Sequence, residues 1–471
     1  MANAIVWFRN DLRLADNPAL QAALDAGQAP ICIYIHAPKE EGEWRPGAAS
    51  DAWRPRSLAA LDADLRKRGS RLRIFAGPSL DVLRSVAAVG DAEAVYWNRR
   101  YEPAIEQRDT RIKQALRGQG LHAASHNGAL LFEPWQLATK QGGPYRVFTP
   151  FWRSALSDWR DHALTDAPAR LPDPGIALEG IELAALRLQP SPAWDAGFWD
   201  DWRPGESGAA EALEVFIDSA LRGYREARDR PDRIGTSRLS PHLHFGEIAP
   251  WRVAAALQAE RTAATAADID AHVRELGWRE FAHHLLHHFP ESTTRNFNPT
   301  FDAFPWRRPA PHALDAWRQG MTGVPIVDAG MRELWHTGWM HNRVRMIVAS
   351  YLCKHMGQHW LEGARWFWDT LVDADLASNT LGWQWVAGTG ADAAPYFRIF
   401  NPVTQGQKFD SEGRYVVRWI PELAGMPASA LHAPWLHQDV LRRHAPGYPR
   451  QPLVDLAEGR EAALAAYRSI R

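Results

Sequence analysis

The residues best suited to chemistry lie between Trp335 and Trp385, where many of the chain's 23 tryptophans stand beside polar and charged side chains. Helical spacing places four of these residues on one face: Trp339, Asn342, Arg345 and Met346. Apolar residues between 344 and 351 repeat on a second face of this predicted helix, so both faces need cover. A buried polar group without a partner costs roughly 1 to 3 kcal/mol, and a charge costs more. We therefore expect a large ligand with polar edges to cover the first face.

A second group combines two aspartates and an asparagine with two further tryptophans: Asp373, Asp375, Asn379, Trp383 and Trp385. Residues two positions apart do not share a helix face, so we expect the two aspartates in a loop that enters a helix. Two carboxylates are too few oxygen donors for a hard metal ion. They are better suited to binding hydroxyl groups, ring nitrogens or an arginine such as Arg345.

The turn GTSRLSP, residues 235–241, combines hydroxyl groups and backbone amides with a proline that opens a helix. Such a turn can bind an anion at the helix N-terminus, although an ordinary capped helix start has the same pattern and is favoured on this pattern alone. Further on, one helical face carries four residues: His272, Glu275, Trp278 and Arg279. They form either a surface pair of Glu275 with Arg279, worth about 0.3 to 0.5 kcal/mol, or the wall of a cavity.

Four histidines in the sequence HHLLHHF form two pairs at i, i+4 spacing, which is the geometry of a zinc site: His283, His284, His287 and His288. They lack the glutamate of an HExxH motif, and histidines just before Pro290 suit the negative end of a helix dipole. We predict no metal site.

Composition and charge argue against a secreted protein, a membrane protein and a cysteine-bound metal site. The net charge of −1 over 471 residues provides no overall attraction for a polyanion. A run of arginines from 222 to 238 is by itself typical of a solvated helix face, and neighbouring aromatic residues make a nucleic-acid surface the second interpretation. Cys32 and Cys353 lack metal-ligand spacing, and residues 1–13 do not resemble a signal peptide. No apolar run approaches the ~20 residues of a membrane helix, so we expect no membrane-spanning segment. We expect a reduced, cytoplasmic protein that is a monomer.

Short β-rich runs alternate with helical patterns in the first third of the chain, at residues 5–8, 31–36, 72–76, 94–97 and 121–125. This alternation predicts an α/β domain with a doubly wound parallel sheet, whose first helix is capped by Asp16 or Asn17. No GxGxxG motif follows a strand, so a Rossmann-type dinucleotide site is not supported. We expect the α/β domain at 1–131, an interdomain linker at 132–205 that lacks sustained periodicity between 164 and 204, and an all-α domain at 206–471.

Three long segments together resemble the photolyase and cryptochrome family, specifically the class I photolyases that repair cyclobutane pyrimidine dimers. The segments are residues 322–332 (TGVPIVDAGMR), 342–360 (beginning NRVRM) and 392–402 (DAAPYFRIFNP), with Tyr351 where phenylalanine is usual. The resemblance covers nearly the whole chain. It implies an N-terminal α/β antenna domain followed by an all-α domain that binds FAD.

The resemblance also implies which residues surround the FAD. Arg345 would pair with Asp373 beside the flavin ring, Asn379 would face flavin N5, and His272 stands where the family often has tryptophan. The implied FAD-binding residues are Tyr224, Thr236, Ser237, Arg238, Leu239, Ser240, His272, Arg279, Trp339, Asn342, Arg345, Asp373, Asp375 and Asn379. A second, light-harvesting chromophore stays undecided between methenyltetrahydrofolate, a deazaflavin and none.

The function implied by the resemblance is light-dependent repair of UV-damaged DNA. Excited, reduced FAD would donate an electron to a flipped cyclobutane pyrimidine dimer, which splits into two pyrimidines. The implied catalytic residues are Glu275, Asn342 and Met346. The implied electron-transfer residues are Trp383, Trp360 and Trp306, with Trp317 as the alternative last member. The implied DNA contacts are Arg228, Glu275, Trp278, Arg279, Asn342, Arg343, Trp385 and Arg398.

Three other functions stay open. A 6-4 photolyase uses a histidine where this chain has Asn342 and usually lacks a glutamate like Glu275. A blue-light cryptochrome photoreceptor often carries a long polar tail, whereas about fifty residues follow Pro421 here, and Asn379 also points to repair. A tryptophan-rich helical binding protein without flavin is the third, and it would be colourless when purified.

Overall fold

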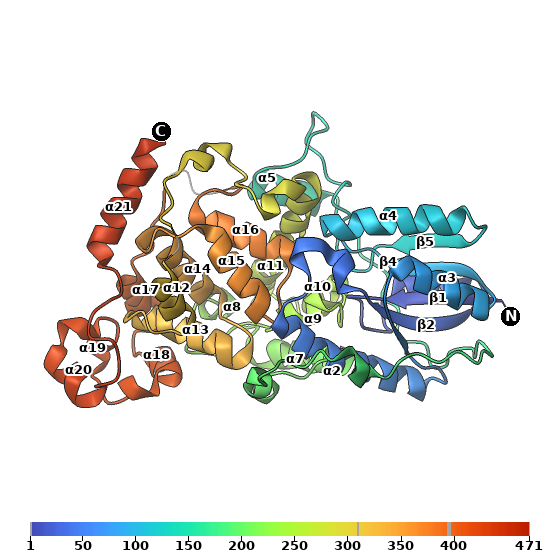
Figure 1. Cartoon of the computed structure of the whole chain (residues 1–471), viewed down its shortest axis with the longest axis horizontal. Coiled ribbons are helices and arrows are strands. Elements are labelled where there is room, and N and C mark those ends of the chain that lie inside the picture. Colours follow the sequence, from blue (N-terminus) through green and yellow to red (C-terminus); the bar gives the residue numbers. More distant parts are fainter. Residues whose placement is uncertain (1, 309, 393–396, 471) are drawn as a thin grey trace.

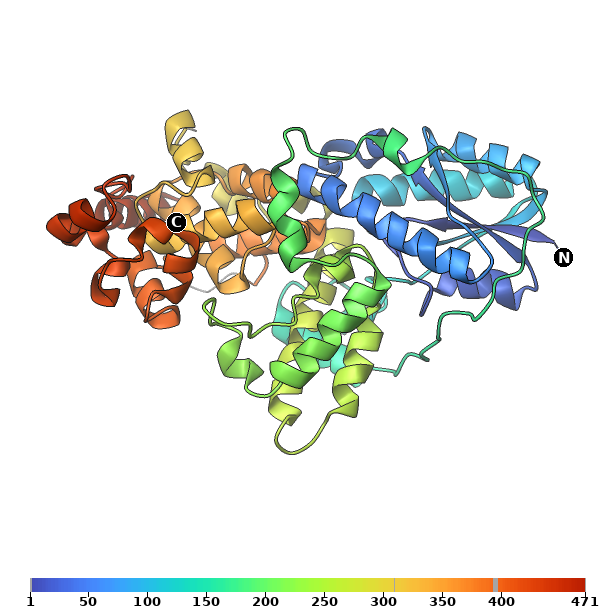
Figure 2. The same ribbon diagram turned by 90° about the horizontal axis from the view of Figure 1, so that it is seen from below.

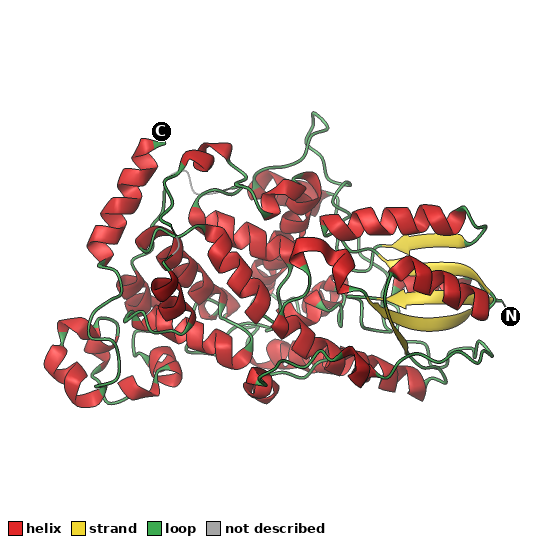
Figure 3. Cartoon of the chain, viewed as in Figure 1, coloured by secondary structure: helices red, strands yellow, loops and turns green. Residues whose placement is uncertain are grey.

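The computed structural model describes residues 2–308, 310–392 and 397–470. An α/β domain forms one end of the molecule and carries the N-terminus, and a helical body forms the remainder (Figure 1). Figure 3 shows the strands of the described chain only at the α/β end. Within the described ranges, no helix has the length and apolar character needed to span a membrane.

Five parallel strands form one sheet, in the order β3-β2-β1-β4-β5. Ile5 of β1 lies beside Ile31 of β2 on one side and beside Val95 of β4 on the other. The doubly wound sheet predicted from the alternating pattern is therefore present. The strands are β1 (Asn3–Phe8), β2 (Ala29–His36), β3 (Arg73–Ala76), β4 (Ala92–Asn98) and β5 (His122–His126).

Helices cover both faces of the sheet, because successive side chains of a strand point to opposite faces. Val6 and Phe8 of β1 pack in a core with α1 and α2, whereas Ile5 and Trp7 pack in a second core with α3 and α4. The four helices are α1 (Pro18–Asp25), α2 (Ala48–Lys67), α3 (Ser79–Val89) and α4 (Pro103–Arg117).

The carboxyl ends of β1 and β4, where open α/β sheets usually bind ligands, are filled by polar side chains of the chain itself. Asn98 Nδ2 donates to Asp11 at 2.6 Å and to Asn17 at 2.8 Å. Asn17 is also the cap of α1, the second of the two predicted caps. The buried Arg13 donates to the carbonyl of Gly246 in the helical body at 2.8 Å. These contacts join the two domains where a ligand crevice would otherwise lie.

The segment 132–205, predicted as the interdomain linker, carries regular structure of its own. It includes α5 (Phe148–Ser157) and α6 (Phe198–Asp201). Phe151 and Trp152 of α5 pack in the core of the helical body, which explains why this stretch folds. The part between α5 and α6 runs as an extended trace along the α/β domain (Figure 2), where Leu171 N donates to Arg68 O at 2.8 Å.

Beyond the linker every regular element of the described chain is helical, as the periodicity predicted. Its largest core lies around α13, α14, α15 and α16. The helices are α7 (Glu206–Ser219), α8 (Tyr224–Ala227), α9 (Ser240–His244), α10 (Pro250–Ala259), α11 (Ala266–His288), α12 (Pro311–Arg318), α13 (Pro325–Thr337), α14 (Asn342–Ser350), α15 (Trp360–Thr370), α16 (Leu376–Ala387), α17 (Pro402–Phe409), α18 (Arg414–Trp419), α19 (Ala428–Leu431), α20 (Gln438–His444) and α21 (Leu456–Ser469).

The predicted helix around Asn342 begins later than the spacing suggested. Gly338 ends α13 with a φ of 67°, a conformation that favours glycine, and α14 starts only at Asn342. Trp339 therefore precedes the helix and does not share its face, which corrects the prediction. The apolar face of α14 is buried as predicted, and the chain continues as a π-helix at Tyr351–His355.

Asp328 of α13 anchors the first of the three matched segments. Its buried carboxylate accepts from the Thr322 amide at 2.7 Å, the Thr322 hydroxyl at 2.6 Å, the Gly323 amide at 2.9 Å and the Tyr448 hydroxyl at 2.5 Å. These bonds fix the start of α13 and tie it to the C-terminal part of the chain. Since α14 packs on α13, the position of α14 depends on the same anchor.

We expect Asp328→Ala to lower the free energy of unfolding by about 2 to 4 kcal/mol, because it leaves several buried donors unpaired. The control is Asp315→Ala, because Asp315 forms an exposed ion pair with Arg318 at 3.4 Å. The control should cost less than about 0.5 kcal/mol. Urea unfolding followed by circular dichroism measures both variants, and equal losses would contradict the anchoring role of Asp328.

Candidate active site

A cavity of about 160 Å³ lies between α14, α15 and α16 of the helical body. Small or apolar residues such as Gly382 and Phe367 form part of its wall. Six of the predicted site residues line it: Asn342, Arg345, Met346, Asp373, Asn379 and Trp383. The polar residues that were predicted to need a ligand therefore share one cavity.

One edge of the cavity is formed by an ion pair. Arg345 Nη2 lies 2.8 and 3.1 Å from the two carboxylate oxygens of Asp373, and Arg345 Nε donates to Met340 O at 2.7 Å. The second aspartate has another role, because Asp375 caps α16 by accepting from Ser378 N at 2.8 Å. The predicted loop that enters a helix is confirmed, as is the pairing of Arg345 with Asp373.

Two glycines shape the cavity around Asn379 and Trp383. Asn379 Nδ2 donates to Ala364 O at 3.0 Å, which fixes the orientation of the amide. A Cβ added to Gly382 would meet no heavy atom within 4 Å, so open space lies beside it. A Cβ added to Gly363 would come within 2.0 Å of the Trp383 ring, so that tryptophan fits only against a glycine.

The predicted anion turn adjoins three of the other predicted cofactor residues. His272 Nε2 lies 3.2 Å from Ser237 Oγ, and Trp339 Nε1 donates to Ser240 Oγ at 3.2 Å. Burial lowers the pKa of His272 to about 4, so its ring is neutral, and its buried Nδ1 has no partner among the described residues. Tyr224 contacts this ring with the centroids 5.2 Å apart.

Arg238, also predicted to bind the cofactor, turns its side chain toward the linker. Its guanidinium lies between the rings of Trp202, at 4.3 Å, and Trp339, at 5.0 Å, and 3.4 Å from Asp201. Its backbone has a φ of 52°, which is unusual for a residue with a side chain. The neighbouring Leu239 is buried in the core.

The predicted wall on α11 has a different ion pair from the one that spacing suggested. Glu275 pairs with Arg228 of the arginine-rich segment at 2.6 Å, and Arg279 instead donates to Ala129 O at 2.7 Å. The surface pair of Glu275 with Arg279 is therefore not formed. Trp278 stacks on Phe148 of the linker helix with ring centroids 3.6 Å apart.

The three predicted electron-transfer tryptophans differ in burial. Trp383 lines the cavity, Trp360 is fully buried, and Trp306 is half-buried. Trp317, the alternative last member, is fully buried and meets Trp383 with centroids 6.3 Å apart. Trp306 is therefore the one of these two that reaches the surface.

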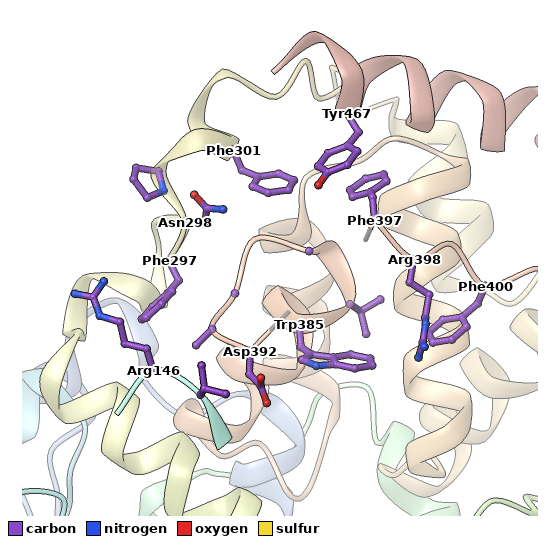
Figure 4. Close-up of a pocket in the computed structure, with 16 residues that line it drawn as sticks. Arg146, Phe297, Asn298, Phe301, Trp385, Asp392, Phe397, Arg398, Phe400 and Tyr467 are labelled. Atoms are coloured by element: carbon purple, nitrogen blue, oxygen red, sulfur yellow. The ribbon is translucent and has the colours of Figure 1, made fainter. Parts of the chain in front are cut away.

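Three of the predicted DNA contacts, Arg343, Trp385 and Arg398, line two further pockets. Trp385 lines a pocket of about 520 Å³ together with Arg146, Asp392 and Arg398 (Figure 4). A second pocket of about 470 Å³ is lined by both signs of charge: Asp229, Arg343, Arg398 and Lys408. Sequence reasoning missed Lys408 and the cap of α17 at Asn401, although the Asn-Pro pair at 401–402 is a helix-start signal. Residues 393–396 of the third matched segment lie outside the described residues.

The four clustered histidines have partners within the protein. His284 Nδ1 and His288 Nε2 lie 2.9 and 3.2 Å from Pro134 O, and His287 lies 3.2 Å from Glu106. His283 lies 3.4 Å from Asp375, which raises the pKa of the histidine and lowers that of the carboxyl. No set of three metal-ligating side chains is found in the ranges that the structure describes.

Glu333 of α13, which the sequence did not mark, supports the turn that leads into α14. Its buried carboxylate accepts from the Tyr415 hydroxyl at 2.6 Å and from the His341 amide at 3.2 Å. His341 Nδ1 in turn accepts from Arg343 N at 3.2 Å and caps α14. Burial raises the pKa of Glu333 to about 7. A helix-interior glutamate carries no local signal of such a role.

Comparison with known proteins finds matches that together cover nearly the whole chain. Residues 272–469 match the family model described as the FAD binding domain of DNA photolyase, and residues 4–173 match the DNA photolyase model. The chain is 48% identical to a deoxyribodipyrimidine photo-lyase of Agrobacterium fabrum, over 100% of this chain and 98% of the relative. It is 38% identical to cryptochrome-1 of Arabidopsis thaliana, over 92% of this chain and 64% of that relative.

A similar solved structure is a bacterial class III photolyase from Agrobacterium tumefaciens. It superimposes with a TM-score of 0.95 at 48% identity, over 100% of this chain and 98% of the other. The predicted fold class is confirmed by this likeness, and the predicted FAD is confirmed by the FAD-binding domain. The predicted class I assignment is imprecise, because this neighbour is of class III.

The raised pKa of Glu333 predicts a pH-dependent stability. A carboxyl with a folded-state pKa of about 7 stabilises the fold fully below its ordinary value of 4.5, and this contribution is lost as the pH rises through 7. We expect the wild type to lose about 3 kcal/mol between pH 4.5 and 8 relative to Glu333→Gln, which cannot ionise. Urea unfolding across this range measures the difference. Glu260→Gln, at an exposed glutamate, is the control, and parallel profiles for wild type and Glu333→Gln would contradict the prediction.

Proposed function

The chain belongs to the DNA photolyase and cryptochrome family, and from this we propose that it is a light-dependent photo-lyase that splits cyclobutane pyrimidine dimers in DNA. The proposal depends on one cavity with two kinds of lining. Arg345, Asp373 and Asn379 supply the polar edge expected around a flavin ring. Asn342 and Met346, which we expect to touch the dimer, line the same cavity. Cofactor and damaged bases would therefore meet in one place.

The residues present fit the ring system of FAD. The open space beside Gly382 accommodates a planar ring, and the pair of Arg345 with Asp373 offers a donor and an acceptor at its edge. The unpartnered Nδ1 of His272 is a further polar group close to the turn at Ser237. Bound here, reduced FAD supplies the light-driven transfer of one electron, which no side chain can supply. The protein holds ring and dimer together and excludes water.

The chain's own side chains would hold the damaged bases. A dimer must leave the duplex to reach the cavity, and its weak stacking lowers the cost of flipping. Trp278, fixed by its stacking on Phe148, would form an apolar wall. Glu275, held by Arg228, would form a hydrogen bond to the dimer. The cations of the second pocket, among them Arg343, would bind backbone phosphates, which position DNA without reading its sequence.

A blue-light photoreceptor is the second candidate, because a plant cryptochrome is among the relatives. Repair is favoured by Asn379, because this amide lines the cavity where an acid could donate a proton to the flavin. Asn342, where a 6-4 photolyase would have histidine, favours the cyclobutane dimer as the substrate. We further propose a cytoplasmic monomer, with the second chromophore undecided between methenyltetrahydrofolate, a deazaflavin and none.

The proposed function is tested by the absorption spectrum of the purified protein, followed by illumination with ultraviolet-damaged oligo(dT) and a reductant. Flavin bands together with recovery of the thymine absorbance would support a dimer photolyase. Flavin without recovery would favour the photoreceptor or a 6-4 enzyme. A protein without flavin would overturn the proposal.

Glu275→Ala should retain FAD, since Glu275 is not part of the cavity lining. It should lower the number of dimers repaired per absorbed photon roughly threefold to tenfold, the effect of one lost hydrogen bond. Glu291→Ala, at an exposed glutamate just beyond α11, is the control and should keep the wild-type yield. The ratio of flavin to protein absorbance and the repair yield are measured together. A wild-type yield in Glu275→Ala would remove this residue from the site.

A further inference from the structure

His359 stands between two tryptophans that the expected electron relay assigns as neighbours. Its ring centroid lies 5.1 Å from that of Trp306 and 5.5 Å from that of Trp360. The described ring contacts include none that joins Trp306 to Trp360 directly. The imidazole therefore contacts both of the outer members of the relay.

The structure requires His359 to be neutral. Its Nδ1 accepts from the Leu361 amide at 3.2 Å and so caps α15, and only an unprotonated nitrogen can accept. Burial and the cation Arg365 lower the pKa of His359, and Asp302 opposes this effect. From the loop that carries Trp306, Arg307 lies against Gly357, two residues before the histidine. Arg365 and Asp302 thus act on a ring that is held uncharged, with Arg307 at the neighbouring Gly357.

Neither indole Nε1 has a basic side chain as its partner within the described part of the chain. Trp306 Nε1 is buried and has no partner among the described residues, and Trp360 Nε1 donates to the amide oxygen of Asn296 at 3.0 Å. When one electron passes from Trp306 to oxidised Trp360, Trp360 is restored and Trp306 is left with a positive charge. No bond forms or breaks in this step. The positive charge therefore arrives beside His359, and an external thiol supplies the electron that restores Trp306.

We propose that His359 is a positioning residue that makes the tryptophan relay sensitive to pH. Neutral, it caps α15 and keeps contact with both indoles. Protonated, it loses the cap and repels the positive charge that must arrive at Trp306. This inference rests on the proposed photo-lyase function and on the tryptophan relay that the family resemblance implies. A unit charge about 5 Å away disfavours a second like charge about fourfold in equilibrium even at the dielectric constant of water, and more within a protein.

The test is light-driven reduction of the oxidised flavin in the full-length protein, with excess thiol, between pH 5 and pH 8.5. Wild type is compared with His359→Asn, whose side chain can still cap the helix but does not titrate. We expect the wild-type yield to fall as the pH approaches the pKa of His359, by about fourfold where the ring is protonated, and the yield of His359→Asn to stay flat. His437→Asn, at an exposed histidine, should keep the wild-type profile. A wild-type profile in His359→Asn would overturn the proposal.

A second readout needs no flavin. In the protein stripped of FAD, the ring resonances of His359, assigned by their loss in His359→Asn, should titrate with a pKa below that of an ordinary histidine. A ring that stays neutral throughout the range of the photoreduction profile would also overturn the proposal.

Failure of the relay can be told apart from failure of the repair function. Trp306→Phe should lower photoreduction, and an unchanged yield would remove both the relay and the role of His359. Repair by chemically reduced protein does not use the relay, so it should be equal in wild type and His359→Asn at every pH. A matching loss of repair in His359→Asn would show that the residue acts on the repair site and would overturn its assignment to the relay. Absence of repair in both proteins would contradict the proposed function instead.

Discussion

The ion pair between Arg345 and Asp373 is the contact on which the site depends. Removing two charges from water costs several kcal/mol per ion, and only good geometry with further hydrogen bonds offsets that cost. The Asp373 side chain is only 4% exposed, and Arg345 meets both of its oxygens as well as a backbone carbonyl. Because one partner lies on α14 and the other precedes α16, the pair sets the distance between these elements. The width of the cavity and its polar edge follow from the same interaction.

The α/β domain contacts the helix that begins in the predicted anion turn. Trp53 of α2 reaches into the helical body, where its Nε1 donates to the buried Glu247 at 2.9 Å and its ring stacks on Phe245. Glu247 also bonds His242 of α9 at 2.5 Å, and α9 opens with Ser240 of the predicted anion turn. Contacts through Trp53, Glu247 and His242 thus connect the α/β domain to the predicted anion turn. A domain attached only through a linker could not act in this way.

Structural features that depend on neighbouring residues could be predicted from the sequence. Alternating apolar runs indicated the five strands, and the spacing of two aspartates indicated a loop before a helix. Prediction from the sequence failed where distant segments compete for the same partner. Arg279 is four residues from Glu275, but the Glu275 carboxylate pairs with Arg228, which lies 47 positions away. Glu333 owes its role to a tyrosine 82 positions away, which no local pattern could reveal. The late start of α14 had a local signal, since Gly338 is a typical helix end, but the hydrophobic period masked it.

Two glycines near the cavity would behave differently in a survey of every possible substitution. Gly363 allows no side chain because the Trp383 ring occupies that space, so variants there would be lost for failing to fold. Gly382 lies inside α16, where glycine costs about 1 kcal/mol relative to alanine, and its missing Cβ leaves room. An alanine there would give a sturdier protein with less room for a cofactor. A screen that measures the abundance of the protein would therefore retain the alanine variant. Only a screen that measures the colour of bound flavin would reject it.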